Sequence, residues 1–460
     1  MVYRSKVASP SLRVKAVSES EDGVSEIGPV AKSLAEGQGL AIPKRPYKSY
    51  LASAVIPERA GAREIRRNNL ELVLRHLALL GPCSRAAIAH RAGLTRPTVS
   101  RLVAELMELR LVREVGTETS SSMGRPGTRL EIDGRHRLAI GCEVNLNSLA
   151  VIVTDLAGRV QYHLRRPVNM VAAEPGSVID ELAKLCQEAV DQLSSVEARG
   201  RPVEAIGIAV PGSVDQKTSR VSNTPNLRDW SELALVAAMR RDLGAPDARI
   251  IVDNDASFAA LAEYWTGPHA GTLDFVHVTG DVGIGGGAVI DGRLLLSSGG
   301  RAGAVGHMVV DANGPACSCG RRGCWESFIG LNAFLSSLNL PSIDDRGPEA
   351  CLRPVVSRAR LGDPVVLDAL TSLGRMLGLG AANLINLLGS DVVILGGYFA
   401  EIAQWILPAA RAVLRERVLV TTPHDDLIVT STLGFNAAAL GAALQAANQV
   451  LSDPILLRLT

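Results

Sequence analysis

One histidine and three cysteines lie close together in the segment GAVGHMVVDANGPACSCGRRGCWE. They are His307, Cys317, Cys319 and Cys324, and they follow the spacing H-x9-C-x-C-x4-C. One imidazole and three thiolates complete a tetrahedral zinc shell, and a closed shell of four protein ligands is typical of a structural site rather than a catalytic one. The spacing therefore predicts one structural zinc ion per chain.

A loop disulfide beside a buried histidine is the alternative to a metal site. Gly314, Gly320 and Gly323 favour the metal, because glycine lets the backbone turn tightly enough for closely spaced ligands to converge. A bridge across the C-x-C pair is sterically awkward. Nothing else in a chain with seven cysteines indicates an oxidising compartment.

The histidine and the string CSCGRRGCWE resemble the zinc motif of the ROK family, which contains sugar kinases and sugar-responsive repressors. The resemblance extends from about residue 64 to the C-terminus. It implies that His307 faces a bound sugar as well as the zinc, and that Glu326 binds sugar hydroxyls. It also implies a two-lobed, actin-like fold with the ligand in the cleft between the lobes.

Composition and charge limit the classes of function. A chain of 460 residues is long enough for two or three domains and a sizeable core. Its 48 basic and 47 acidic residues nearly cancel, so any contact with nucleic acid must come from a local basic patch. We find no apolar run expected to span a bilayer and no signal-peptide pattern. We therefore expect a cytoplasmic, nucleoid-associated protein that makes no membrane contact.

Three regions differ in pattern. Residues 1–62 are rich in Ser, Gly, Pro and Ala without sustained periodicity, which is typical of a disordered tail, with a DNA-contacting arm as the alternative. Residues 63–135 have the pattern of a winged helix-turn-helix domain, and residues 138–460 form the ROK-like domain. By the resemblance, lobe 1 covers about 138–266 with a C-terminal helix at 437–450, and lobe 2 covers about 267–436.

Start and stop signals outline three short helices in the N-terminal domain. Leucine and valine recur at helical spacing up to Gly81, which together with the following proline ends the first helix. Ser84 is a natural N-cap for a second helix, and Thr95 caps a third helix with a proline in its first turn. Two expected strands, 111–115 and 128–132, then flank a polar wing.

This pattern indicates DNA binding, with a winged helix used only for protein contacts as the alternative. Arginines at the leading end of a recognition helix reach guanine edges or phosphates, and a wing arginine reaches the minor groove. The wing also resembles that of ROK repressors, which carries the same Gly-Arg-Pro, whereas free-standing ROK kinases lack such a domain. The residues expected to contact DNA are Ser84, Arg85, Thr95, Arg96, Thr98, Ser100, Arg101, Gly124 and Arg125.

From residue 138 onward strands alternate with helices, which indicates an α/β fold with helices packed on mixed sheets. We expect three successive strands within 138–168 and a helix at 178–195. The segments 205–214 and 249–255 are expected to pass from a strand into a loop. Further strands are expected at 275–280, 286–292 and 392–397, with alanine-rich helices around the last.

Kinases of the ROK family hold nucleotide phosphates on two glycine-rich loops, and both loops differ here. Asn145 and Leu146 replace paired glycines, and Asn147 replaces a threonine. The second loop begins with Asp281 and Val282 in place of Gly-Thr. Side chains obstruct the close approach of backbone amides to phosphate, and a carboxylate repels it. We therefore expect that the protein is not an enzyme.

The sugar side of the cleft is better preserved. The resemblance places Asp255 where the kinases have their catalytic base, so here it is a relic base that accepts a hydrogen bond from the ligand. An Asn-Asp pair suits two adjacent hydroxyls, although such a pair alone is more often a turn. Ala304 stands where the family usually has glutamate, which removes one carboxylate from the site. The expected sugar-binding residues are Gly212, Asn226, Asn254, Asp255, His307 and Glu326.

Together these patterns predict a DNA-binding transcriptional regulator, with a repressor favoured, that senses a sugar or sugar derivative through a degenerate sugar-kinase domain. Its expected partners are a double-stranded DNA operator and the small effector. One winged helix reads too short a site for useful specificity, so we expect a homodimer or homotetramer. Two alternatives stay open: a bifunctional ATP-dependent sugar kinase with a DNA-binding domain, and a regulator that binds no ligand.

Overall fold

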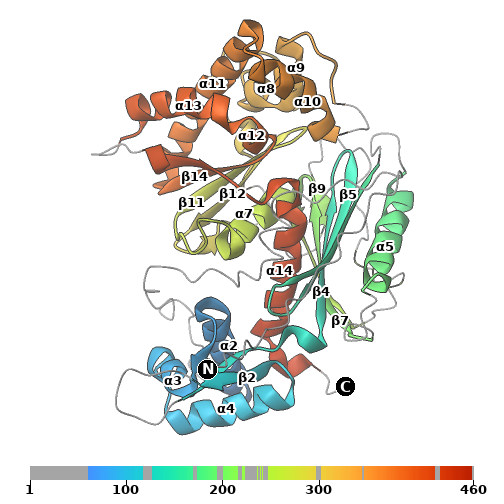
Figure 1. The fold of residues 1–460 in the computed structure, drawn as a ribbon, viewed down its shortest axis with the longest axis vertical. Coiled ribbons are helices and arrows are strands. Elements are labelled where there is room, and N and C mark those ends of the chain that lie inside the picture. Colours follow the sequence, from blue (N-terminus) through green and yellow to red (C-terminus); the bar gives the residue numbers. More distant parts are fainter. Residues whose placement is uncertain are drawn as a thin grey trace, which may run out of the picture.

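The computed structural model of the chain describes residues 61–117, 127–168, 174–193, 200–215, 220–222, 236, 239, 241, 247–296, 302–343, 347–419 and 425–457. Within this part, a small helical domain lies at one end of the molecule and a lobe rich in helices lies at the other, with a second α/β lobe between them (Figure 1). The disordered tail expected at 1–62 falls almost entirely outside the described residues.

The N-terminal domain packs three helices against a three-stranded sheet. Helices α2 (Ala62–Leu80), α3 (Arg85–Ala92) and α4 (Arg96–Glu108) confirm the three expected helices. Strands β2 (Val112–Thr117) and β3 (Thr128–Ile132) pair antiparallel, as expected. The pattern missed β1 (Cys83–Ser84), which pairs with β3, because a two-residue strand is too short to show periodicity.

Capping and apolar packing explain the helix ends of this domain. The Ser84 hydroxyl accepts a hydrogen bond from the backbone N–H of Ala87, and the Thr95 hydroxyl accepts one from Thr98. Gly93, at φ +65°, ends α3 in the left-handed conformation that glycine adopts easily. The core between the helices contains Leu70, Val73, Leu74, Ile88, Val99, Leu102, Val103 and Leu106.

Lobe 1 is built on a five-stranded sheet in the order β10-β7-β4-β5-β6. Strands β4 (Leu138–Val144), β5 (Ser148–Asp155) and β6 (Val160–Pro167) form an antiparallel meander, which confirms the three expected strands. Strands β7 (Val203–Val210) and β10 (Arg249–Asn254) extend it in parallel. Also in this lobe are α5 (Pro175–Asp191), the hairpin of β8 (Ser213–Asp215) and β9 (Arg220–Ser222), and the short η2 (Gly134–His136) before β4.

Lobe 2 has its own five-stranded sheet, in the order β13-β12-β11-β14-β15, with helices packed above it (Figure 1). Its strands are β11 (Phe275–Gly280), β12 (Ile284–Ile290), β13 (Arg293–Leu294), β14 (Val392–Gly397) and β15 (Ile428–Thr430). Its helices are η3 (Val305–His307), α8 (Glu326–Ile329), α9 (Leu331–Ser337), α10 (Gly347–Arg360), α11 (Pro364–Leu388), α12 (Tyr398–Glu401), α13 (Ala403–Arg417) and η4 (Asp425–Leu427).

Two helices lie between the sheets of the lobes and pack against each other. Helix α7 (Asp255–Thr266) covers β11 and β12, and α14 (Ala437–Ser452) crosses β4, β5 and β7 (Figure 1). The expectation that 249–255 passes into a loop was wrong, because Asn254 caps α7 and the helix begins at once. The expected C-terminal helix is confirmed; η5 (Gly434–Asn436) precedes it and η6 (Pro454–Leu456) follows it.

Glycines allow α14 to lie very close to its neighbours. A Cβ atom at Gly141 of β4 would lie 2.0 Å from the carbonyl oxygen of Ala439, and one at Gly207 of β7 would lie 2.2 Å from that of Ala442. On the opposite side, a Cβ at Gly441 would lie 1.7 Å from the carbonyl oxygen of Phe258. Helix α14 is therefore in backbone contact with both lobe 1 and α7.

The C-terminal half of α14 also joins the N-terminal domain. Ala446, Ala447 and Val450 belong to the same buried apolar cluster as the core of α2 and α4. The guanidinium of buried Arg137 donates to the carbonyl oxygen of Leu109 at 2.8 Å and pairs with Glu204 at 2.9 Å. The N-terminal domain is thus docked on lobe 1 through a shared core.

One described helix, α11, is long and apolar enough to cross a membrane by length and composition alone, and half of its apolar stretch is buried inside the protein. The expectation that no apolar run reaches this length was therefore wrong. Its apolar side packs against α13 and in the core of lobe 2, with Leu370, Leu377 and Leu384 among the buried side chains.

Candidate functional site

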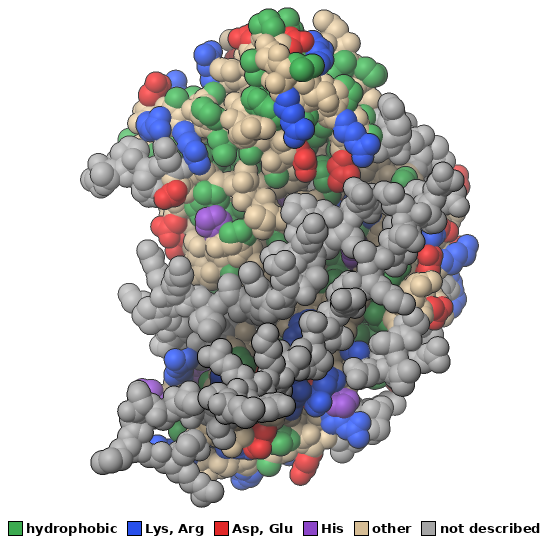
Figure 2. All heavy atoms as spheres, in the orientation of Figure 1, with side chains coloured by type: hydrophobic (Ala, Val, Ile, Leu, Met, Phe, Trp, Pro, Cys, Tyr) green, Lys and Arg blue, Asp and Glu red, His purple; other side chains and the backbone are tan. Residues whose placement is uncertain are grey.

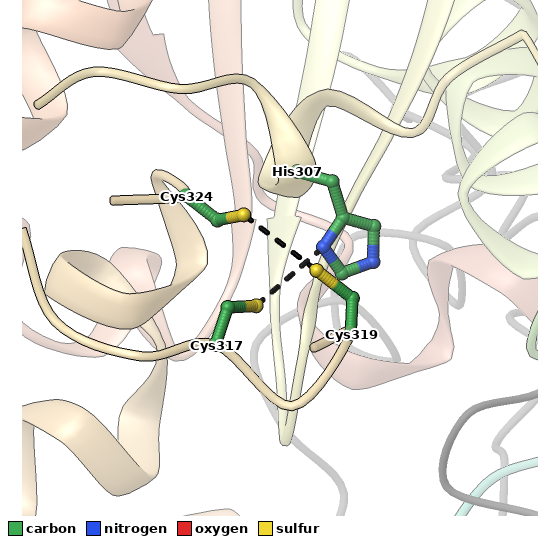
Figure 3. Close-up of side chains that lie close together, drawn as sticks. All are labelled: His307, Cys317, Cys319 and Cys324. Carbon is green, nitrogen blue, oxygen red and sulfur yellow. Dashed lines mark hydrogen bonds between the residues drawn. The ribbon is translucent and has the colours of Figure 1, made fainter. Parts of the chain in front are cut away.

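The four predicted metal ligands meet in space. Figure 3 shows the imidazole of His307 and the three cysteine side chains turned toward a common point. Their ligand atoms all lie within 4.8 Å of one another. The Sγ atoms of Cys319 and Cys324 are 3.7 Å apart, far beyond the disulfide bond length of about 2.05 Å. The cluster can hold a metal ion, and the disulfide alternative is wrong for this structure, in which Cys317, Cys319 and Cys324 form no disulfide bond.

A tight loop brings these ligands together. Short antiparallel bridges join Val309 to Cys324 and Ala316 to Arg322, so the loop folds back on the segment that follows His307. Gly323 has φ +68°, and a Cβ there would lie 1.6 Å from the carbonyl oxygen of Asp311. Only glycine fits at this position.

The glycine run that opens β12 gathers the predicted sugar-binding groups. A Cβ at Gly285 would lie 2.9 Å from the Cβ of Ala256, next to Asp255. A Cβ at Gly286 would lie 2.6 Å from the side chain of Val305 in η3, which carries His307. The missing side chains therefore let α7 and η3 approach the same strand, where kinases of this fold would use the glycines for phosphate.

Glu326 links the metal loop to β12. Its Oε2 accepts a hydrogen bond from the backbone N–H of Ile284 at 3.0 Å, and its Oε1 accepts one from the hydroxyl of Ser318 at 3.2 Å. Ser318 lies between two of the metal ligands in the sequence. The Glu326 carboxylate is therefore held at the cleft by both elements, a role that the sequence pattern did not show.

Asn254 stands at the end of β10 and caps α7. Its Oδ1 accepts from the backbone N–H of Ser257, and its Nδ2 donates to the carbonyl oxygen of Gly212 at 2.9 Å. Gly212 has φ +107°, so the loop after β7 depends on glycine there. The Asn254 side chain also hydrogen-bonds the Asp255 carboxylate, so of its two acceptor sites and two donor hydrogens only an acceptor site remains for a ligand. Another of the six predicted sugar-binding residues, Asn226, lies outside the described residues.

Asp255 lies at the N-terminus of α7, among other carboxylates. The pKa of Asp255 is raised to about 7, mainly by burial and in smaller part by the nearby carboxylates of Glu143 and Asp281. A hydrogen bond from the backbone N–H of Ala256 opposes these effects in part. Asp255 as a whole residue is half-buried.

The two altered phosphate loops contact each other directly. The Nδ2 atom of Asn145 donates to Oδ2 of Asp281 across the cleft at 2.6 Å, and to Oε1 of Glu143 at 3.1 Å. Arg165 of β6 pairs with Glu143 at 3.2 Å. Sequence reasoning identified Asn145 and Asp281 as obstacles to phosphate but missed Arg165, because no motif marks a strand residue 22 positions from its partner.

The residues expected to contact DNA have different environments. Arg96, Ser100 and Arg101 are exposed on α4, and Thr95 and Thr98 lie at its N-terminus. Arg85 forms an ion pair with Glu114 at 2.9 Å. Ser84 is a correction: it is buried and its hydroxyl caps α3, so its side chain is not available to DNA. Gly124 and Arg125 lie outside the described residues.

Charged side chains of both signs are mixed over the visible face of the molecule (Figure 2). This mixture agrees with the formal net charge of +1. No large field of one sign covers the described surface on that face, so an electrostatic footprint for DNA has to be local, as at the exposed arginines of α4.

Two family models match the chain. The ROK family model matches residues 139–449, more than half of the chain. The IclR helix-turn-helix domain model matches residues 72–116, which span α3 and α4.

Relatives share nearly the whole length. The xylose repressor of Bacillus subtilis (strain 168) is 29% identical over 377 residues, which cover 82% of this chain and 94% of the relative. A crystal structure of a ROK family transcriptional regulator, described as a homolog of the E. coli MLC protein, has a TM-score of 0.70 and 26% identity. The match covers 85% of this chain and 98% of that chain.

A kinase structure matches about two thirds of the chain. The ROK family glucokinase from Streptomyces griseus, in complex with glucose and AMPPNP, has a TM-score of 0.55 and 28% identity, covering 66% of this chain and 98% of that chain. The two lobes thus have the sugar-kinase-like actin fold. The chain belongs to the ROK family, and its ROK domain follows an IclR-type helix-turn-helix domain.

Proposed function

We propose that the protein is a DNA-binding transcriptional regulator, acting as a repressor, whose ROK domain senses a sugar or sugar derivative. One observation carries this proposal. The helix-turn-helix domain shares a buried core with α14, and α14 packs along α7, the helix that begins at Asp255 in the cleft. The names of the relatives, a xylose repressor and a ROK family transcriptional regulator, support the same assignment.

The geometry of the cleft favours binding over phosphoryl transfer. That reaction depends almost entirely on positioning the phosphates and stabilising their charge. Here Asn145 and Asp281 fill the position with a side-chain hydrogen bond, and the carboxylate repels phosphate oxygens. We therefore propose that the protein is not a sugar kinase, and that Asp255 accepts a hydrogen bond from the ligand rather than a proton during catalysis.

The Cys/His cluster suits one zinc ion per chain. With Zn–S bonds of about 2.3 Å, a tetrahedral shell separates two sulfurs by roughly 3.8 Å, close to the 3.7 Å between Cys319 and Cys324. Burial and the neighbouring thiols raise the pKa of Cys324 to about 12, so three thiolates in this space need a cation. The ion would fix the loop on which Glu326 is held, and so would act as a scaffold rather than a catalyst.

The sugar would lie between the groups that β12 gathers. Asn254 and Asp255 come from the N-terminus of α7, His307 from η3, and Glu326 from the metal loop. Carboxylates accept hydrogen bonds from hydroxyl groups, and amides both accept and donate them. None of these four residues has a large apolar side chain. A neutral polyhydroxyl ligand fits this chemistry, and D-xylose is the first candidate because a relative is named a xylose repressor.

Binding would regulate DNA affinity by linkage. A ligand that prefers one arrangement of the lobes shifts the protein toward it, and DNA affinity changes by the same coupling free energy. The connecting elements are α7 and α14. We further propose that the protein acts as a homodimer or homotetramer, because a single winged helix reads only a short site. We place it in the cytoplasm, at the nucleoid. We propose domain boundaries at 63–135 for the DNA-binding domain and 138–460 for the ROK domain.

Operator binding tests the proposal. A double-stranded fragment selected from random sequence for binding to wild type is titrated with Arg96→Ala and Arg101→Ala. Each variant should bind about 5- to 150-fold more weakly, as expected for losing a bidentate base contact worth about 1–3 kcal/mol.

The matched control is Arg110→Ala, which removes the same charge just beyond the other end of α4. It should bind within about twofold of wild type. If Arg96→Ala and Arg101→Ala bind as well as Arg110→Ala, the exposed face of α4 does not read DNA and the proposal fails.

The pH dependence of effector binding tests the role of Asp255. With a pKa of about 7, the carboxyl group of Asp255 is almost fully ionised above pH 8 and largely protonated below pH 6. D-Xylose should therefore release the operator at several-fold lower concentration at pH 8 than at pH 6, since hydrogen bonds to charged groups are stronger.

Asp255→Asn should raise the required sugar concentration by about 5- to 150-fold and reduce this pH dependence to the part that comes from Asp281, whose pKa is about 6, because the new amide does not titrate. DNA affinity without sugar should not change. ATP turnover by wild type that disappears in Asp255→Asn would instead establish the kinase alternative.

A further inference from the structure

The turn between β4 and β5 carries polar side chains that are almost fully enclosed. β4 ends at Val144, which pairs with Leu149 of β5, so residues 145–147 form the turn. Asn145 is 9% exposed, although asparagine in a turn is usually solvated. The other lobe covers this turn, so its burial depends on how closely the lobes approach.

Asn145 makes the contact between the lobes. Its Nδ2 donates to Oδ2 of Asp281, which follows β11 of lobe 2, at 2.6 Å. The second oxygen of Asp281 accepts from the backbone N–H of Val282 at 2.9 Å. Burial, opposed in part by the hydrogen bond from Asn145, raises the pKa of Asp281 to about 6, so the carboxylate is mostly ionised at pH 7.5. The bond is then charge-assisted, the stronger class.

A second set of contacts, on the lobe 1 side, orients the side chain of Asn145. Its Oδ1 accepts from the backbone N–H of Leu146, and its Nδ2 also donates to Glu143. Glu143 pairs with Arg165, and the Arg165 guanidinium donates to the Ser148 hydroxyl at 2.7 Å. The same guanidinium donates to the carbonyl oxygen of Phe435, just before α14. The amide of Asn145 is therefore oriented before it meets Asp281.

We propose that Asn145 and Asp281 form an interlobe tether, a direct hydrogen bond that holds the two lobes together where a nucleotide would bridge them in a kinase. The tether makes this arrangement of the two lobes independent of nucleotide. It also connects the cleft to the start of α14 through Glu143 and Arg165. Asn145 and Asp281, which obstruct phosphate binding, thus also hold the two lobes together.

Amide hydrogen exchange on the full-length protein at pH 7.5 tests the tether without sugar or DNA. Asn145→Ala should speed exchange about tenfold in residues 281–286, which belong to the other lobe. Asp281→Ala should do the same in residues 145–150, and the double variant should add nothing further. A purely local role would change exchange only in the lobe that carries the substitution.

Asn147→Ala is the matched control from the same turn. Its Nδ2 has no hydrogen-bond partner among the described residues, so the substitution should leave exchange in 281–286 as in wild type. If Asn145→Ala does not fold, Asn145→Ser keeps a small polar group in the turn but is too short to reach Asp281. AMPPNP should not slow exchange in wild type.

Unchanged exchange across the cleft in both single variants, additive effects in the double variant, or protection by AMPPNP would each overturn the tether. A second measurement rests on the proposed function: Asn145→Ala should change the D-xylose concentration that releases the operator by about tenfold. If sugar has no effect on wild type, the sensor proposal fails, and the exchange result still decides the tether.

Discussion

Cys324→Ser is expected to yield protein with almost no zinc, whereas wild type purified under reducing conditions should carry about one zinc per chain. Cys324 is fully buried and lies 3.7 Å from Cys319, so a serine there leaves three ligands around a position built for four. Elemental analysis of the purified proteins measures the difference.

The thermal stability of the protein should fall when the zinc is lost. Loss of a structural metal is one of the few single changes that cost several kcal/mol, and each kcal/mol shifts the thermal midpoint of a domain of this size by about 2–4 °C. We therefore expect a midpoint roughly 5–10 °C lower and no operator release by sugar, because Glu326 is held partly by Ser318 of the metal loop.

Cys351→Ser is the control for the loss of a thiol. Cys351 lies in α10, outside the cluster, so this variant should keep its zinc and its response to sugar. Wild-type protein without metal that still responds to sugar would contradict the scaffold role. So would Cys324→Ser with a full complement of zinc.

Gly441→Ala is expected to lower the free energy of unfolding by about 3 kcal/mol. The added Cβ would lie 1.7 Å from the carbonyl oxygen of Phe258, and a backbone atom cannot move aside as a side chain can. The gain of about 1 kcal/mol in helix propensity offsets only part of this cost. Urea unfolding measures the change, and operator titration should show a weaker response to sugar because α14 is displaced from α7.

Gly176→Ala provides the matched control. Gly176 lies in α5, where a Cβ would meet nothing within 4 Å, so only the propensity gain remains. This variant should be as stable as wild type or more stable by up to about 1 kcal/mol. Equal stability of Gly441→Ala and wild type would show that α14 and α7 are farther apart in solution than this structure has them.

Capping residues predicted the local structure well, because their effect depends only on residues close to them in the sequence. The N-caps Ser84 and Thr95 and the proline in the first turn after Thr95 identified where α3 and α4 begin. The metal ligands behave in the same way, since Cys317, Cys319 and Cys324 share one short loop and only the histidine comes from outside it.

The predictions from sequence were wrong where tertiary packing decides the structure. Ser84 was expected to serve both as a cap and as a DNA contact, but its burial leaves only the first role. The apolar length of α11 was underestimated, because Asp368 and Arg375 interrupt the apolar run although the helix as a whole is apolar. The strand of two residues, β1, depends on its pairing with β3 and carries no signal of its own.

The sequence by itself determined which groups are available: one histidine and three thiolates for a metal, Asn254 and Asp255 at the end of a strand, and two phosphate-loop segments altered at Asn145, Leu146, Asn147, Asp281 and Val282. These are properties of residue type and spacing. Only the tertiary structure decided which groups meet. Asn145 and Asp281 are 136 positions apart, and α14 lies against both α7 and the N-terminal domain. Such contacts depend on how the two lobes pack, and no local pattern along the chain encodes that geometry.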